Sequence, residues 1–125
     1  IALLHVDSET APLPVGSMEV GATGTFVVYR ADDAVAQPFR AISFVDINAP
    51  DIDHHGSSLR RGYQVRATVE RGDSGAVLVA DGVATAVVFA RSTASGDKAW
   101  AVDIGEAEEL IEHAGETPID VGACT

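Results

Sequence analysis

The 125-residue sequence has one cysteine, one lysine and no apolar run near the roughly 18 residues that a membrane-spanning helix needs. Basic residues are scarce altogether, with eight Lys and Arg against nineteen Asp and Glu, for a net charge of −11. Since phosphate groups are bound by clustered Lys and Arg, this balance argues against nucleic acid or anionic lipid as a partner. A solubilising acidic surface is the simpler explanation of the charge.

Both ends of the chain lack an expected feature. The sequence has no start methionine and opens on the apolar, strand-like run IALLHV, so we interpret it as a fragment or a processed chain. At the other end, the single cysteine, Cys124, has no second cysteine in the chain to pair with. In an exported protein it would pair with a cysteine outside this sequence, whereas in the cytosol it would be a free thiol. Composition leaves both alternatives open.

The sequence does contain a series of short apolar segments rich in Val, Ile, Phe and Thr, separated by Gly, Pro and Asp. Regular short strands with turn residues between them predict an all-β sandwich or small barrel. Asp81-Gly82 predicts a tight hairpin, and the proline-containing segment Thr10–Gly21 predicts a surface linker. The strands are predicted at Ala2–Val6, Thr23–Arg30, Phe39–Asp46, Tyr63–Glu70, Ala76–Ala80, Val83–Arg91 and Lys98–Asp103.

One helix is predicted near the C-terminus, over Ile104–Ala114. Asp103, followed three residues later by Glu106, resembles a capping box, and Gly115 is a natural stop. The apolar stripe of this helix consists of Ala107, Leu110 and Ile111. The remaining tail, Glu116–Thr125, is predicted to be extended.

The stretch ERGDSGAVLV, from Glu70 to Val79, carries the only strong chemical motif. A serine nucleophile needs an exposed hydroxyl and donors aimed at the developing oxyanion. Gly72 would let the backbone amides of Gly72 and Ser74 converge on one point. Gly75 would let the chain enter the next strand without a side chain that blocks the serine. The motif therefore predicts a nucleophile turn centred on Ser74.

Two other motifs overlap or precede this turn. Arg71–Ser74 spells the adhesion tetrapeptide RGDS, but it lies between two apolar strands rather than at a mobile loop tip, so we attribute it to chance. Asp51-x-Asp53-x-His55 resembles the start of a calcium loop, yet Gly62 stands where a bidentate Glu is required. We therefore predict no metal site, and expect a solvated loop that would border a substrate cleft.

The serine motif is similar to that of a known family. The segment GDSGAVLV resembles the trypsin/chymotrypsin-fold pattern GDSGGPLV, with Ala76 and Val77 in place of Gly-Pro. The following strand, Ala86–Ala90, resembles the strand that binds substrate backbone in that family. The opening IALLHV resembles the family's D-[IV]-A-L-L-x-[VL] segment, whose leading aspartate is the triad acid.

Within this fold, the sequence most resembles the MarP-type proteases, which are membrane-anchored periplasmic serine proteases of actinobacteria. The similar segments are Asn48–Ile52, Tyr63–Ala67 and Gly122–Cys124, and the likeness extends over nearly the whole chain in order. The resemblance implies the C-terminal six-stranded antiparallel barrel of a two-barrel trypsin-like fold, with a C-terminal helix. Residues 1–12 would then be the last strand of the first barrel and the start of the linker. The second barrel would span 13–103, the helix 104–115 and the tail 116–125.

The resemblance also implies roles for individual residues. Ser74 would be the nucleophile, the amides of Gly72 and Ser74 the oxyanion hole, and Asp73 and Gly75 supporting residues. Substrate would contact Thr68, Val69, Val88, Phe89 and Ala90. Because Thr68 and Val69 are uncharged, we expect a preference for small or medium side chains over Arg or Lys. No cofactor is implied.

The family's chain order places the triad His and Asp before Ile1. None of the four histidines of the chain, His5, His54, His55 and His113, follows the family's TAAH-like pattern. We therefore expect the isolated chain to be inactive and its first partner to be the N-terminal barrel of the same protein, with a peptide or protein as substrate. The alternatives are a non-catalytic β-barrel interaction module derived from such a protease, and a clipped chain that stays docked to its N-terminal half.

The likeness to MarP-type proteases implies a compartment as well. We expect an extracytoplasmic protein, periplasmic or secreted, whose parent is anchored in the inner membrane. It also implies that Cys124 pairs with a cysteine of the first barrel, with a free thiol as the alternative.

Overall fold

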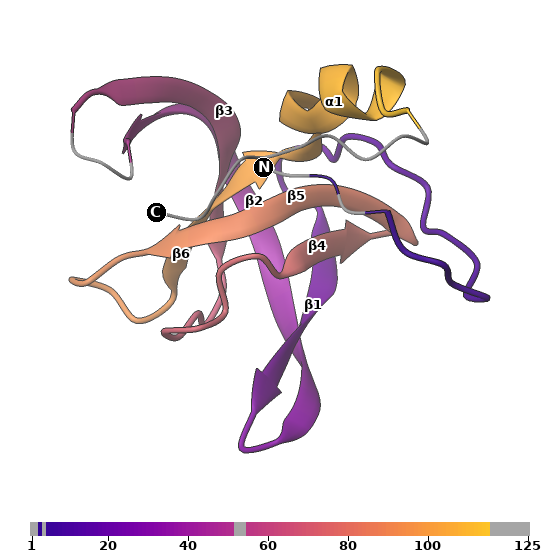
Figure 1. Cartoon of the computed structure of the whole chain (residues 1–125). Coiled ribbons are helices and arrows are strands. Elements are labelled where there is room, and N and C mark those ends of the chain that lie inside the picture. The colour runs from indigo at the N-terminus through magenta and orange to yellow at the C-terminus, as the bar shows by residue number, and fades with distance from the viewer. Residues whose placement is uncertain (1–2, 4, 52–54, 116–125) are drawn as a thin grey trace.

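Six antiparallel strands form a closed barrel in the order β1-β2-β3-β6-β5-β4 (Figure 1). The computed structural model describes residues 3, 5–51 and 55–115. The strands are β1 Thr23–Arg30, β2 Asp33–Pro50, β3 Ser57–Arg66, β4 Val77–Ala80, β5 Val83–Arg91 and β6 Lys98–Asp103. They are followed by the 3₁₀ helix η1 Ile104–Ala107 and the α-helix α1 Glu108–Glu112. This confirms the predicted all-β class, the six-stranded barrel and the C-terminal helix.

The barrel encloses a core of small and medium apolar side chains. Phe26, Val65, Leu78 and Val88 are each at most 1% exposed, and alanines fill much of the remaining interior. Along β1 and β6 the buried positions alternate with exposed or half-buried ones, as the pleat of a strand requires. The predicted bounds of β1, β5 and β6 agree with the structure.

Two hairpins of the barrel have two-residue turns. Asp81 and Gly82 join β4 to β5 with φ of 50° and 76°, the positive values that a type I′ turn needs, which confirms the predicted hairpin. Ala31 and Asp32 join β1 to β2 in the same way, with φ of 50° and 68°. The sequence did not indicate this second turn, because neither residue is Gly or Asn.

The turn at Ala31 and Asp32 carries removable backbone strain. L-residues pay about 1–2 kcal/mol in the left-handed region, which Gly avoids and Asn tolerates best among the others. We expect the double substitution Ala31→Asn/Asp32→Gly to raise the free energy of unfolding by about 1 kcal/mol, measured by urea denaturation. The control Asp81→Asn, at a turn that already contains Gly82, should change it less. A double variant with lower stability would contradict this assignment of strain.

The hairpin of β2 and β3 differs most from the predicted strands. β2 continues well beyond Phe39–Asp46 at both ends, and β3 begins six residues before the predicted Tyr63–Glu70 and ends at Arg66. The two strands pair from Arg40 with Arg66 to Pro50 with Ser57, with a register shift between Ala41 and Ser43. No residue is buried over 46–50 and 57–61, so no core pattern marks this part of the two strands in the sequence.

The N-terminal segment is not a strand in the part that the structure describes. Leu3, His5 and Val6 have no regular structure, and Leu3 and Val6 are 45% and 70% exposed. These three residues do not form a strand in the structure, and their assignment to the last strand of a first barrel stays a prediction. Thr10–Gly21 contains no helix or strand, and it is held to the barrel by a bridge between Val15 and Ala84 and by backbone hydrogen bonds to Ala84 and Ala41.

The C-terminal helix is shorter than predicted and begins as 3₁₀ structure. Asp103 caps it by accepting a hydrogen bond from the Gly105 amide at 2.8 Å. Glu106 does not complete the capping box, because its Oε1 accepts a hydrogen bond from the Arg61 amide instead, at 3.0 Å. Among the described residues, no helix is long and apolar enough to cross a membrane. The tail and Cys124 lie outside the described residues.

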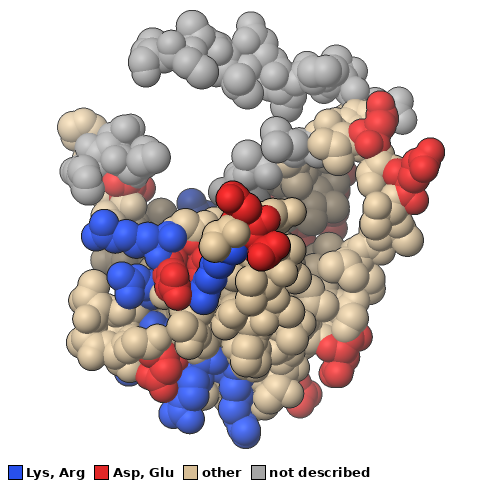
Figure 2. All heavy atoms as spheres, turned by 90° about the horizontal axis from the view of Figure 1, so that it is seen from below, with Lys and Arg blue, Asp and Glu red and all other residues tan. Residues whose placement is uncertain are grey.

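The surface carries charges of both signs. On the face shown in Figure 2, Lys and Arg lie in separate groups with Asp and Glu between them. Two ion pairs illustrate this mixture, the exposed pair of Arg66 with Asp97 at 3.4 Å and the pair of Arg60 with the half-buried Glu106 at 3.3 Å.

Candidate active site

The segment Glu70–Ala76, here called the serine turn, connects the end of β3 to β4. Gly72 and Gly75 have φ of 100° and 98°, values that L-residues with side chains rarely adopt. The Gly75 amide donates to the Val88 carbonyl at 2.8 Å, and the Val88 amide donates to the Ala76 carbonyl at 2.9 Å. The turn is therefore fixed against β5.

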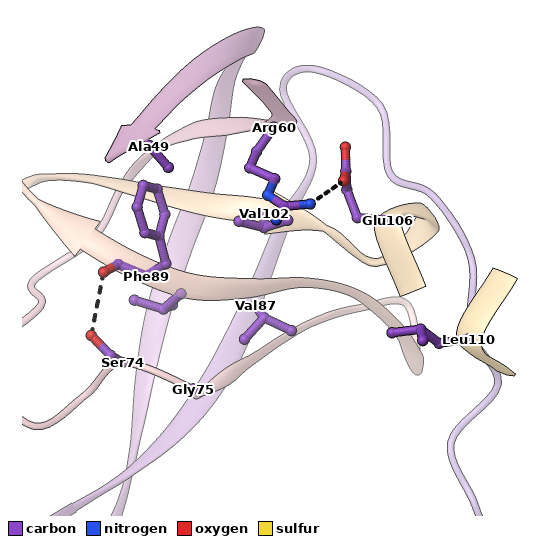
Figure 3. Close-up of a pocket in the computed structure, with 10 residues that line it drawn as sticks. Ala49, Arg60, Ser74, Gly75, Val87, Phe89, Val102, Glu106 and Leu110 are labelled. Atoms are coloured by element: carbon purple, nitrogen blue, oxygen red, sulfur yellow. Dashed lines mark hydrogen bonds and ion pairs between the residues drawn. The ribbon is translucent and has the colours of Figure 1, made fainter. Parts of the chain in front are cut away.

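Ser74 is exposed at the tip of this turn, and its Oγ lies 3.4 Å from the Phe89 carbonyl oxygen (Figure 3). The amides of Asp73, Gly75 and Ala76 all donate to carbonyl groups. Within the described part of the chain, the amides of Arg71, Gly72 and Ser74 have no acceptor. The turn thus presents an exposed hydroxyl and nearby N–H groups that can donate, which are the nucleophile and the kind of oxyanion donor that acyl transfer at a serine uses.

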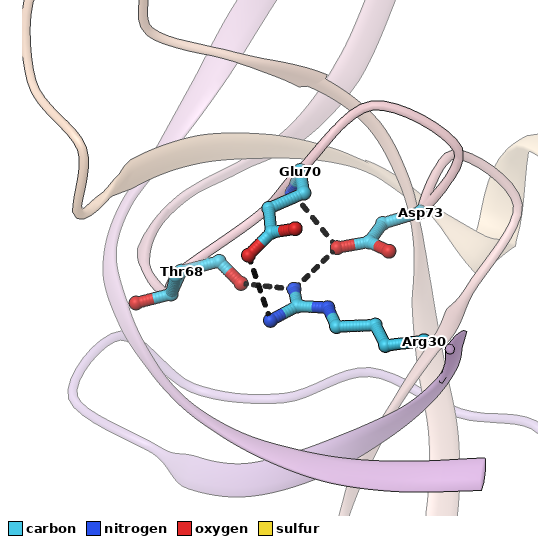
Figure 4. A network of polar contacts seen from close by, with 4 residues as sticks. All are labelled: Arg30, Thr68, Glu70 and Asp73. Carbon is cyan, nitrogen blue, oxygen red and sulfur yellow. Dashed lines mark hydrogen bonds and ion pairs between the residues drawn. The ribbon is translucent and has the colours of Figure 1, made fainter. Parts of the chain in front are cut away.

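Asp73 is buried directly beside Ser74, with 4% of its side chain exposed. Its Oδ2 accepts hydrogen bonds from the Glu70 amide at 2.8 Å and from Arg30 Nη2 at 2.7 Å (Figure 4). Arg30 also donates to the Thr68 carbonyl at 3.2 Å and pairs with Glu70 at 3.1 Å. The hydrogen bond to Asp73 raises the pKa of Arg30 above its usual value. Asp73 therefore has the contacts of a structural carboxylate.

An open hollow of about 590 Å³ lies beside Ser74. Most of its wall is apolar, and an ion pair between Arg60 and Glu106 lies on the side away from Ser74 (Figure 3). The Arg61 amide and Arg60 hold the pKa of Glu106 below its usual value, so this carboxylate is charged at neutral pH. The hollow is lined by Ala49, Arg60, Ser74, Gly75, Val87, Val88, Phe89, Val102, Glu106 and Leu110.

The structure brings some of the predicted site residues together and separates others. Ser74 and Gly75 share the hollow with Val88 and Phe89 of β5. Thr68 is exposed with its carbonyl on Arg30, and Val69 is buried in the barrel core. Ala90 is half-buried and does not line the hollow.

Sequence analysis missed the ionic contacts of the site. Arg30 lies 43 residues before its partner Asp73, and no local pattern links the two. The pair Arg60 and Glu106 was missed for the same reason, since 46 residues separate them.

None of the described histidines lies at the hollow. His5, His55 and His113 are exposed, and Nδ1 of His113 lies 2.8 Å from the Glu109 carbonyl of its own helix. His54 lies outside the described residues. Over residues 3, 5–51 and 55–115, no group of three or more His, Cys, Asp or Glu is placed to hold a metal ion.

Comparison with known proteins reveals similarity over almost the whole chain. No family model matches the sequence. The serine proteases Rv3671c and MT3772, from the H37Rv and CDC 1551 strains of Mycobacterium tuberculosis, are each 30% identical to it over 131 residues. Each match covers 99% of this chain and 33% of the relative. The chain therefore spans about a third of the length of the curated relatives it matches.

Solved structures agree with this match. The active form of the Rv3671c protease has a TM-score of 0.78 and 27% identity, covering 93% of this chain and 54% of that one. The inactive form of a serine-to-alanine mutant has a TM-score of 0.72 and 26% identity, covering 89% and 57%. The chain is homologous to a trypsin-like serine protease. This confirms the resemblance to MarP-type proteases, and the barrel of the homologue is a trypsin-like barrel.

Proposed function

We propose that this chain is the C-terminal part of a serine endopeptidase that forms an acyl-enzyme on Ser74. The observation that carries the proposal is the serine turn, where the exposed Ser74 hydroxyl borders an apolar hollow and the amides of Gly72 and Ser74 have no acceptor among the described residues. Homology to a serine protease supports the same chemistry. We call the longer protein that would contain this chain the parent protein.

In this mechanism Ser74 Oγ attacks the carbonyl carbon of the scissile peptide bond. The triad His would take the proton of the Ser74 hydroxyl, and the amides of Gly72 and Ser74 would donate to the oxyanion of the tetrahedral intermediate. As the intermediate collapses, the same His would protonate the leaving amine, and the acyl group would stay on Ser74. Water, deprotonated by the His, would then hydrolyse this ester, release the acid and return the proton to Ser74. Asp73 does not act as a base, because its Oδ2 is already bonded to Arg30 and the Glu70 amide. The His and Asp of the triad come from sequence before Ile1.

The hollow supports a preference for uncharged side chains. Val87, Val88 and Phe89 give it an apolar wall, and its two charged residues, Arg60 and Glu106, are paired with each other. An Arg or Lys side chain bound there would have no free carboxylate to pair with. We propose that the enzyme selects peptides with small or medium side chains at this position.

The likeness to MarP-type proteases supports an extracytoplasmic parent protein anchored in the inner membrane, with Cys124 paired to a cysteine of the first barrel. Mass analysis of the parent protein without reducing agent tests this pairing. A disulfide-linked peptide that contains Cys124 is expected, and a free thiol on Cys124 in the protein as exported would contradict it.

We propose that Ser74 lies in this chain and that the triad His and Asp lie upstream of it. Comparing peptide hydrolysis by this chain alone and by the parent protein tests this proposal. We expect turnover by the parent protein and none by the isolated chain, because the described residues provide no base at Ser74. Circular dichroism of the isolated chain would check that the barrel has folded. If the isolated chain hydrolyses peptides, and Ser74→Ala abolishes this hydrolysis, then the triad does not depend on upstream residues.

The rival function is a non-catalytic interaction module with the same barrel. This alternative predicts a parent protein that folds but does not hydrolyse peptides. The exposed Ser74 hydroxyl beside an apolar hollow and the homology to a serine protease favour the enzyme.

A further inference from the structure

Strands β2 and β3 continue beyond the barrel as a two-stranded ribbon. We call residues 46–50 and 57–61 the outer ribbon, and none of these residues is buried. β3 pairs with β6 from Arg66 to Gly62, and the outer ribbon lies beyond this last pair. A two-stranded ribbon by itself is at best marginally stable in water. Neither core packing nor pairing with β6 therefore fixes the position of the outer ribbon.

A carboxylate of η1 holds the outer ribbon where it leaves the barrel. Glu106 Oε1 accepts a hydrogen bond from the Arg61 amide at 3.0 Å, and Glu106 Oε2 lies 3.3 Å from Arg60 Nη1. Arg61 is the first residue of β3 beyond the last pair with β6. Glu106 thus accepts a backbone hydrogen bond at the point where β6 no longer provides a partner.

The contacts of Glu106 are those of a charged group held in one position. The bond from the Arg61 amide, with Arg60 beside it, lowers the pKa of Glu106, as expected of a carboxylate that accepts hydrogen bonds in its charged form. The ion pair with Arg60 contributes less, because the Arg60 side chain is 47% exposed. The bond to the Arg61 backbone is therefore the contact that fixes the outer ribbon.

The outer ribbon forms one wall of the hollow beside Ser74. Ala49 and Arg60 line the hollow from the ribbon, and Phe89 lines it from β5. In Figure 3 the ring of Phe89 points from β5 toward the ribbon. A movement of the ribbon would change the width of the hollow at this wall. It would therefore also change the size of the side chain that the hollow can accept.

We propose that Glu106 is a positioning residue that sets the side-chain size accepted by the hollow, because it fixes the outer ribbon through the Arg61 amide. The inference rests on the proposed function, since it takes the hollow as a binding site for substrate side chains. Glu106 also lines the hollow, so its test must separate the bond to Arg61 from the charge of the carboxylate.

The test measures the substrate preference of the parent protein with Glu106→Ala, Glu106→Gln and the control Glu109→Ala. Peptide pairs carry Val or Phe at each position near the scissile bond, and the preference is the ratio of kcat/KM within a pair. This ratio does not depend on the fraction of protein that is folded. At the position where the wild type most prefers Val, Glu106→Ala should lower the ratio by about tenfold, the discrimination of one methylene group in an apolar pocket.

Glu106→Gln separates position from charge. Its amide oxygen still accepts a hydrogen bond from the Arg61 amide, but the negative charge is lost. We expect this variant to keep the wild-type ratio. Glu109 is exposed on α1 and does not line the hollow, so Glu109→Ala should also match the wild type. An unchanged ratio in Glu106→Ala, an equal shift in Glu106→Gln, or a wild type that prefers Val at no position would overturn the inference.

A shorter carboxylate provides a second variant if Glu106→Ala does not fold. Glu106→Asp keeps the charge but withdraws the carboxylate by one methylene group, which stretches or breaks the bond to the Arg61 amide. We expect the ratio to shift in the same direction as in Glu106→Ala. An unchanged ratio in Glu106→Asp would then overturn the inference.

A further measurement does not depend on the proposed function. Hydrogen–deuterium exchange of the parent protein, followed by mass spectrometry, reports on the backbone amides of the outer ribbon. Glu106→Ala should speed exchange over 46–50 and 57–61 and leave β1 unchanged, because the ribbon has lost its attachment. Unchanged exchange in the ribbon would overturn the inference even if Ser74 is the nucleophile. Faster exchange in a parent protein that hydrolyses no peptide would support the positioning of the ribbon and reject the proposed enzyme.

Discussion

Ser74→Ala is expected to lower kcat/KM of the parent protein for peptide substrates by at least about 10³-fold. A serine protease without its nucleophile retains only the contributions of its oxyanion hole and substrate binding. Stability should change little, because Ser74 is exposed and its one contact, to the Phe89 carbonyl, is long at 3.4 Å. The measurements are initial rates of peptide cleavage and urea denaturation.

A matched control for this substitution is Ser58→Ala, at a half-buried position of β3 that does not line the hollow. It should leave both activity and stability close to those of the wild type. If the parent protein cleaves peptides and Ser74→Ala cleaves them at the same rate, the assigned nucleophile is wrong.

Asp73→Ala is expected to have the largest effect on stability among substitutions in the serine turn. It removes a buried carboxylate and leaves the Glu70 amide without its acceptor. The loss of such a buried, charge-assisted hydrogen bond, together with the cavity it leaves, should lower the free energy of unfolding by about 3 kcal/mol. Activity should fall as well, because the amides of Gly72 and Ser74 lose their support.

The control for Asp73→Ala is Asp97→Ala. Asp97 also pairs with an arginine, but its side chain is 61% exposed, and exposed ion pairs contribute about 0–1 kcal/mol. Urea denaturation of both variants compares a buried and an exposed carboxylate in the same barrel. Equal losses of stability in the two variants would contradict the structural role of Asp73.

The strands with local alternation were predictable from the sequence. The predicted bounds of β1, β5 and β6 equal those of the structure, because each is a short run rich in apolar residues whose ends are marked by turn or charged residues. The hairpin between β4 and β5 was also predictable from local sequence, since Asp81 and Gly82 both tolerate positive φ.

Features that depend on distant residues were not predictable. β2 extends to Asp33 and Pro50 because β1 and β3 pair with its ends, not because of its own apolar pattern. The turn at Ala31 and Asp32 is imposed by the pairing of Arg30 with Asp33 in the β1–β2 register. In these places the tertiary structure overrides local preference.

In the candidate site, too, the local features were predictable from the sequence and the contacts between distant residues were not. Gly72 and Gly75 indicated the shape of the serine turn, and both have the positive φ that such a turn needs. The cation beneath the turn, Arg30, could not be found in this way, because only the folded barrel brings it to Asp73.

The central claim is that Ser74 is the nucleophile of a serine endopeptidase, and labelling with a fluorophosphonate tests it most directly. The parent protein would be treated with the reagent, digested and analysed by mass spectrometry to locate the adduct. The account predicts one adduct, on Ser74, which is absent from the Ser74→Ala variant and from protein unfolded before treatment. A folded parent protein with no adduct on Ser74, or with the adduct on another serine, would contradict it.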